Sequence, residues 1–145
     1  MIVYFDSSAL VKRYLAEADS AQVRTLLAEA VITGTSLISR AEVSAALAKA
    51  VRMNWLTRDL AGQLLRVFRA QWADLITVDV TEAVVAQADS LAWEYGLRGY
   101  DAVHLASALL WQNGLSETVT LATFDKQLWA AAQLVGLEVW PGALV

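Results

Sequence analysis

Four acidic residues each follow a short apolar run and lie at or near the expected start of a helix: Asp6, Glu42, Asp101 and Asp125. If the apolar runs are parallel strands of one sheet, their carboxyl ends share one edge, and the four carboxylates converge there. Two carboxylates about 4 Å apart repel each other by roughly 4 kcal/mol at an effective dielectric constant of about 20. Such a cluster therefore needs protons or a cation, and Mg²⁺ or Mn²⁺ suits oxygen ligands of this kind. A metal ion among carboxylates favours chemistry on phosphate groups.

Each acid also has a simpler interpretation as a helix-start residue. Ser39 and Glu42 fit the capping-box pattern S-x-x-E, in which the glutamate returns a hydrogen bond to the start of the helix. Asp6 would cap the helix after the first strand, and Asp101 and Asp125 suit the positive end of a helix dipole. Taken singly, capping is the stronger interpretation. Taken together, four acids favour a site, because Ser, Thr and Asn cap helices as well, and the two roles are compatible.

The elements that must position these acids alternate between strands and helices. Five runs are strand candidates: Ile2–Phe5, Ile32–Ile38, Leu75–Val80, Val119–Thr123 and Leu137–Trp140. Helical spacing of apolar residues and capping residues predict the helices between them: residues 7–15, 19–30, 40–52, 57–68, 82–96, 101–112 and 125–134. Gly99 is expected to break the chain before the sixth helix. The alternation predicts an α/β fold, a three-layer α/β/α sandwich with a short, mainly parallel five-stranded sheet.

Composition limits the class of protein. The 145 residues fit a single domain, 1–145, with a full core, and 57% hydrophobic against 18% charged residues is too apolar for disorder. No apolar run reaches the roughly 18 residues of a membrane helix, and the start has no basic leader. The chain has no cysteine, which excludes disulfides, thiol catalysis and cysteine zinc sites. A cytoplasmic protein with no membrane role is expected.

The charge balance leaves nucleic acid open as a partner. The net charge is −4, yet the 11 acids outside the quartet balance the 11 Lys and Arg residues. Several basic residues flank the acids in sequence: Lys12, Arg13, Arg40, Arg98 and Lys126. They either help to hold a phosphodiester at a metal-loaded site or are ordinary solvated charges, and the sequence supports both interpretations equally.

Four segments carry a more specific pattern: D-S-S-A-L-V-K from Asp6, S-R-A-E-V from Ser39, Y-D-A-V-H-L-A-S-A-L from Tyr100 and A-T-F-D-K-Q-L from Ala122. In this order and spacing they resemble the motifs of PIN domains over the whole chain. The resemblance is closest to the small prokaryotic toxins of the virulence-associated protein C type. It implies a PIN-like fold and a Mg²⁺- or Mn²⁺-dependent endoribonuclease that cleaves RNA, pairs with a small antitoxin and is often a homodimer.

The same resemblance assigns roles to individual residues. The four acids match the family's acidic quartet and are expected to be both catalytic and metal-binding. Asp6 and Asp101 are the expected direct ligands, and the other two acids are expected to act through bound water or a second ion. Ser8 and Thr123 match polar positions that line the family's site.

Other conspicuous residues are expected to be structural. His104, the one histidine, has no second imidazole for zinc and no triad partner. Trp93, Trp111 and Trp129 lie in helical apolar patterns, which predicts packing rather than base stacking, whereas Trp55 follows a turn and is a candidate for exposure. The helices between residues 40 and 72 form either an interaction surface or an internal hairpin.

Two other functions remain open. The fold could serve as a catalytically idle PIN-like binding module. A phosphotransfer receiver domain also gathers acids around Mg²⁺, but it needs adjacent acids after the first strand, where Asp6 is followed by Ser7 and Ser8. A dehalogenase-like phosphatase needs D-x-D there, and position 8 is serine.

Overall fold

A computed structural model describes all residues from 1 to 145, and five parallel strands form its one sheet. The strands are β1 (Ile2–Phe5), β2 (Ile32–Ser36), β3 (Ile76–Val78), β4 (Val119–Ala122) and β5 (Glu138–Trp140). Their order is β3-β2-β1-β4-β5, with every pair parallel. The central strand β1 is buried along its whole length, so its carboxyl end lies in the middle of the sheet edge.

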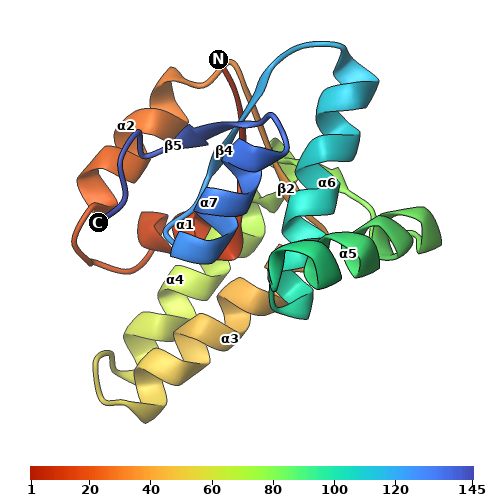
Figure 1. Cartoon of the computed structure of the whole chain (residues 1–145). Helices are drawn as coiled ribbons and strands as arrows, with labels where there is room; N and C mark the ends of the chain where they lie inside the picture. Colours follow the sequence, from red (N-terminus) through yellow and green to blue (C-terminus); the bar gives the residue numbers. More distant parts are fainter.

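Seven helices surround the sheet (Figure 1). They are α1 (Ser7–Leu10), α2 (Ser20–Glu29), α3 (Ser39–Arg52), α4 (Arg58–Gln71), α5 (Glu82–Tyr95), α6 (Gly99–Leu115) and α7 (Lys126–Leu134). No helix combines the length and the apolar character that crossing a membrane would require.

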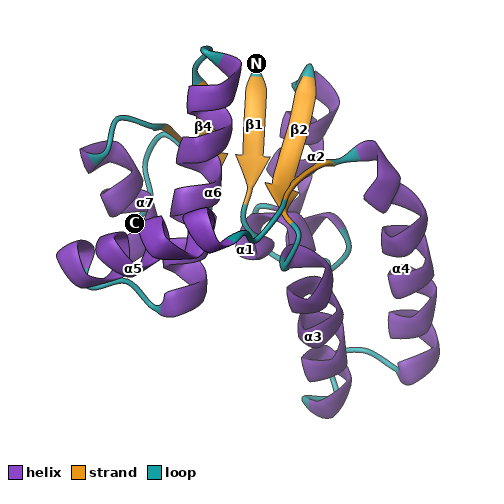
Figure 2. Ribbon diagram, turned by 90° about the vertical axis from the view of Figure 1, so that its right-hand side faces the viewer, coloured by secondary structure: helices purple, strands orange, loops and turns teal.

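The side chains of β1 alternate between two cores, as a strand's period of two requires. Ile2 and Tyr4 join the core formed with α5, α6 and α7, and Val3 and Phe5 join the core formed with α1, α2, α3 and α4. Figure 2 shows β1 and β2 between these two groups of helices. The expected three-layer α/β/α sandwich with a five-stranded parallel sheet is confirmed.

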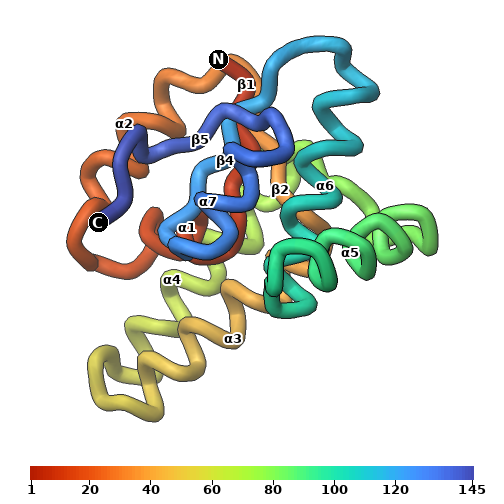
Figure 3. The backbone as a smooth tube through the Cα atoms, viewed as in Figure 1, coloured from red at the N-terminus to blue at the C-terminus, as the bar shows by residue number.

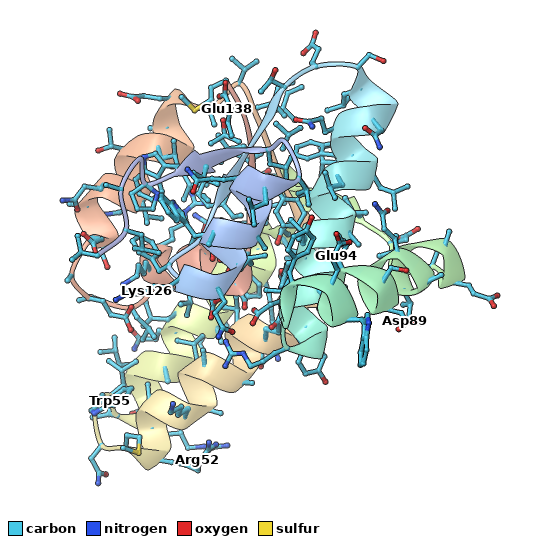
Figure 4. All side chains as sticks on the ribbon, viewed as in Figure 1. Arg52, Trp55, Asp89, Glu94, Lys126 and Glu138 are labelled. Atoms are coloured by element: carbon cyan, nitrogen blue, oxygen red, sulfur yellow. The ribbon has the colours of Figure 1, made fainter.

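Helices α3 and α4 lie side by side as a hairpin that extends away from the sheet (Figures 1 and 3). Thr57 caps α4 by accepting a hydrogen bond from the backbone N–H of Leu60. The segment thus forms a helical hairpin, and Trp55 near its tip is exposed, as expected (Figure 4).

Some expected boundaries were wrong. The helix expected over residues 7–15 is α-helical only to Leu10 and continues as a 3₁₀ turn over Val11–Arg13. The second strand ends at Ser36, because Leu37 and Ile38 form the turn into α3. Gly99 does not break the chain but begins α6, where the first backbone N–H groups of a helix need no partner within it.

Of the three tryptophans expected to pack, Trp93 does not. Its side chain is 91% exposed, because α5 turns Val84, Ala88 and Leu91 toward the core. Trp93 lies two residues after Leu91, about 200° around the helix axis. Trp111, in contrast, is partly buried and packs against the core that contains Tyr4.

Gly34 in β2 allows this close approach of Trp111 to the sheet. A Cβ atom at Gly34 would lie 2.6 Å from two ring carbons of Trp111.

We expect Gly34→Ala to destabilise the protein by about 1–3 kcal/mol through overpacking, measured by urea unfolding. Gly114→Ala is the matched control, because nothing lies within 4 Å of a Cβ there, and its gain in helix propensity should stabilise by about 0.5–1 kcal/mol. Equal stability of Gly34→Ala and the parent would contradict this packing.

Candidate functional site

All four acids of the expected quartet line one cleft at the carboxyl edge of the sheet. Its volume is about 350 Å³. The lining residues are Asp6, Ser7, Ser8, Glu42, Arg98, Tyr100, Asp101, Phe124 and Asp125. Asp6 directly follows β1, Glu42 lies in the helix after β2, Asp101 lies in the first turn of α6, and Asp125 caps α7 after β4. Parallel pairing therefore brings Asp6, Glu42 and Asp125 to one edge of the sheet. The expectation that Asp101 also follows a strand was wrong, because α6 follows α5, and the start of α6 places Asp101 in the cleft.

Asp6 is the most buried acid of the cleft, at 2% exposed. Its Oδ1 accepts hydrogen bonds from Ser8 Oγ at 2.7 Å and the backbone N–H of Ala9 at 2.9 Å, and its Oδ2 accepts from Thr123 Oγ1 at 2.6 Å. Burial raises the pKa of Asp6, opposed by the nearby His104 and by these donors. Ser8 and Thr123, which sequence analysis placed at the site, fix the orientation of this carboxylate.

Thr123 also connects Asp6 to Asp125. Its Oγ1 accepts a hydrogen bond from the backbone N–H of Asp125 at 3.1 Å while it donates to Asp6. Asp125 Oδ1 accepts from the backbone N–H of Leu128 at 2.9 Å, which caps α7. Asp6 and Asp125 are thus helix caps as well as residues of the cleft, which confirms the capping interpretation for both, and their role as site residues stays a prediction.

Arg98 joins two of the acids at the mouth of the cleft. Its Nε donates to Asp101 Oδ2 at 2.9 Å and its Nη2 donates to Asp125 Oδ2 at 2.8 Å. Burial raises the pKa of Asp101, and the hydrogen bond from Arg98 lowers it. The Arg98 side chain is 74% exposed, and solvent-exposed ion pairs contribute only about 0–1 kcal/mol each. This guanidinium is therefore a readily displaced cation on two carboxylates.

Glu42 has no role in capping its helix. The N-cap of α3 is Ile38, which makes no side-chain cap hydrogen bond. The Ser39 hydroxyl lies 2.6 Å from Thr35 Oγ1 instead. The capping-box interpretation of Ser39 and Glu42 was wrong, because the helix begins one residue earlier than expected, at Ser39 itself, which makes Ile38 its N-cap.

The Glu42 side chain contacts His104. His104 Nε2 lies 2.6 Å from Glu42 Oε1, and His104 Nδ1 lies 2.8 Å from the Tyr4 hydroxyl. His104 is 1% exposed, which fits the buried residue expected, but its contact with an acid of the cleft was not foreseen. The sequence contained one indication that His104 lies near the cleft: it follows Asp101 by three residues, which places both side chains on one side of α6.

The donor set suits a hard divalent cation, although the arrangement does not yet form a complete coordination shell. Carboxylate oxygens are the ligands that Mg²⁺ and Mn²⁺ prefer, and two of these carboxylates already share one cation, Arg98. No three acidic or histidine side chains are grouped so that they could hold one ion together. Metal binding by the quartet therefore remains a prediction that requires movement of Arg98.

Comparison with known proteins agrees with this geometry. The PIN domain family matches residues 3–134. Two relatives from Mycobacterium tuberculosis, named Ribonuclease VapC45 (strain CDC 1551 / Oshkosh) and Ribonuclease VapC49 (strain H37Rv), are each 37% identical over 144 residues. Each of these alignments covers 99% of this chain and 97% of the relative.

Solved structures share the fold at lower identity. A toxin–antitoxin complex from Klebsiella pneumoniae contains a chain that matches with a TM-score of 0.69 and 19% identity, covering 99% of both chains. VapBC2 from Rickettsia felis, bound to a DNA fragment from its promoter, matches with a TM-score of 0.65 and 17% identity, covering 97% of this chain and 99% of that one. The family match, the full-length relatives and the parallel sheet show that this chain belongs to the PIN-domain family, in its VapC-type branch.

Proposed function

We propose that this chain is a metal-dependent endoribonuclease and the toxin of a type II toxin–antitoxin pair, acting as a single domain over residues 1–145. One observation carries the proposal: four carboxylates from distant parts of the sequence line one cleft, and an exposed cation already lies on two of them. The names of the two mycobacterial relatives, both ribonucleases, support RNA as the substrate.

In this proposal Mg²⁺ or Mn²⁺, held by Asp6 and Asp101 with Glu42 and Asp125 nearby, would supply an activated water and neutralise charge on the phosphate. The protein's own residues prepare the cleft. Ser8 and Thr123 hold Asp6 in a fixed orientation. Arg98 would exchange its carboxylate partners for a phosphate oxygen of the RNA, which a planar guanidinium binds well.

The proposed partners are RNA, a cognate antitoxin and a second copy of the chain. Toxin–antitoxin complexes among the structural neighbours support the antitoxin. The hairpin of α3 and α4 offers two adjoining grooves of about 430 and 610 Å³, lined by apolar residues and several arginines. We propose this hairpin as the surface for the protein partners.

The direct test is incubation of the purified protein with total cellular RNA in Mg²⁺ or Mn²⁺, followed by mapping of the new RNA ends. Defined cut sites that disappear with chelator are expected. Intact RNA under all metal conditions would favour the alternative of an idle binding module.

The quartet is tested by Asp6→Asn and Asp101→Asn. Each removes one carboxylate charge, so we expect cleavage to fall by at least about 100-fold, while the melting temperature stays equal to or above the parent's because like-charge repulsion is relieved. Asp89→Asn is the control, because Asp89 is an exposed residue of α5 outside the cleft (Figure 4). A folded Asp6→Asn protein that cleaves RNA at the parent's rate in limiting Mg²⁺ would show that the quartet is not the site.

Competition between Arg98 and the metal is tested by Mn²⁺ titration calorimetry without RNA. Removing the two ion pairs in Arg98→Gln should tighten Mn²⁺ binding by about fivefold, since two exposed pairs of about 0.5 kcal/mol each contribute about 1 kcal/mol in total. Arg52→Gln, at the far end of the hairpin (Figure 4), makes the same charge change outside the cleft. Equal affinities for these two variants would show that Arg98 does not compete with the metal.

A further inference from the structure

We propose that His104 is a positioning residue for Glu42 and that Tyr4 sets the hydrogen-bonding state of its ring. The inference rests on the proposed nuclease function and adds two buried residues to the machinery of the same cleft. The chain of contacts runs from Tyr4 on β1, through His104 on α6, to Glu42 on α3. It therefore connects the central strand to a helix on each side of the sheet.

The direction of the contact between His104 and Glu42 follows from the chemistry of the groups. An ionised carboxylate only accepts hydrogen bonds, so His104 Nε2 carries a hydrogen and donates to Glu42 Oε1 across 2.6 Å. A distance this short is typical of a charge-assisted hydrogen bond. The same direction holds for a neutral and for a protonated imidazole, because Nε2–H is present in both.

Tyr4 stabilises the tautomer of the neutral ring that donates to Glu42. In the neutral ring the one hydrogen lies on Nε2, so Nδ1 is an acceptor, and the Tyr4 hydroxyl, which keeps its hydrogen because burial raises its pKa well above the ordinary value, donates to Nδ1 across 2.8 Å. This hydrogen bond favours the tautomer whose single ring hydrogen lies on Nε2, the nitrogen that faces Glu42. Tyr4 thereby stabilises His104 as a donor toward the cleft.

Glu42 depends on this donor for its orientation. Its side chain makes one hydrogen bond, through Oε1 to His104, and Oε2 has no protein partner. Glu42 lines the cleft, its backbone belongs to α3, and no helix cap restrains its carboxylate. The imidazole therefore holds one oxygen and leaves the other free for a ligand in the cleft, as second-layer donors do for metal-binding carboxylates.

His104 is the only histidine, so one pair of imidazole nitrogens labelled with ¹⁵N reports on this contact without any measurement of activity. We expect a slowly exchanging Nε2–H signal with one-bond coupling in the parent protein. Glu42→Gln, which removes the charge of the acceptor, should shift that signal, and Tyr4→Phe should allow the hydrogen to populate Nδ1. A hydrogen on Nδ1 in the parent, or a spectrum insensitive to Glu42→Gln, would overturn the assignment.

Kinetics then separate positioning from packing. His104→Leu should lower the single-turnover cleavage rate by about 10- to 100-fold, with the apparent affinity for RNA unchanged. In the Glu42→Gln background the same substitution should cause little further loss, because the residue it orients has lost its function. His104→Gln, whose amide can still donate, should recover part of the rate.

Two further variants distinguish a lower cleavage rate from a loss of folding. Leu105→Val perturbs a fully buried neighbour in the same helix and should lower stability without lowering the rate per folded molecule. If His104→Leu does not fold, Tyr4→Phe takes its place, since it keeps the ring packing on His104 and Trp111 and should give a smaller rate loss. Equal losses from His104→Leu in both backgrounds would overturn the inference.

Two results distinguish the proposed nuclease site from the proposed role of His104. Normal cleavage by Glu42→Gln would overturn the assigned quartet, and with it the role of His104. An inactive Glu42→Gln together with a fully active, folded His104→Leu would leave the nuclease site standing and would reject His104 as its positioning residue.

Discussion

Parallel pairing of β1 with β2 on one side and β4 on the other is the constraint on which the site depends. The register pairs Tyr4 with Gly34 and with Leu121, so the three strands end at nearly the same level. Because side chains alternate along a strand, a slip of one residue would exchange the two faces of β1 and turn Tyr4 away from His104. The two cores, which require opposite faces of β1, make such a slip costly.

The protein manages the repulsion among its four carboxylates in three different ways. Asp6, the most buried, is surrounded by neutral donors: two hydroxyls and one backbone N–H. Asp101 and Asp125, nearer to solvent, share the guanidinium of Arg98. Glu42 faces the imidazole of His104. The buried carboxylate is compensated by neutral hydrogen-bond donors, and the two at the mouth of the cleft are compensated by the exposed guanidinium of Arg98.

The sequence was sufficient for the architecture because alternation and helical spacing are local signals. They predicted five strands, the three layers and the shared edge that collects the acids, and threonines cap two of the predicted helices, Thr57 in α4 and Thr81 in α5. The contacts that give the cleft its chemistry join residues remote in sequence. Arg98 meets Asp125 across 27 positions and His104 meets Glu42 across 62, and no periodicity encodes such pairs. The S-x-x-E pattern at Ser39 gave a wrong capping prediction. Strand β2 ends at Ser36, so the chain already turns at residues 37 and 38 and α3 begins at Ser39.

The position of β4 inside the sheet, between β1 and β5, has a consequence for synthesis. Translation delivers β1 first and β4 much later, so β1 lacks one of its two neighbours until Val119–Ala122 have left the ribosome. Thr123 and Asp125, which complete the surroundings of Asp6, emerge later still. Contacts of such long sequence separation form late in folding. An unfinished chain therefore has an open, incomplete cleft, and the complete carboxylate cluster arises only after Asp125 has been synthesised.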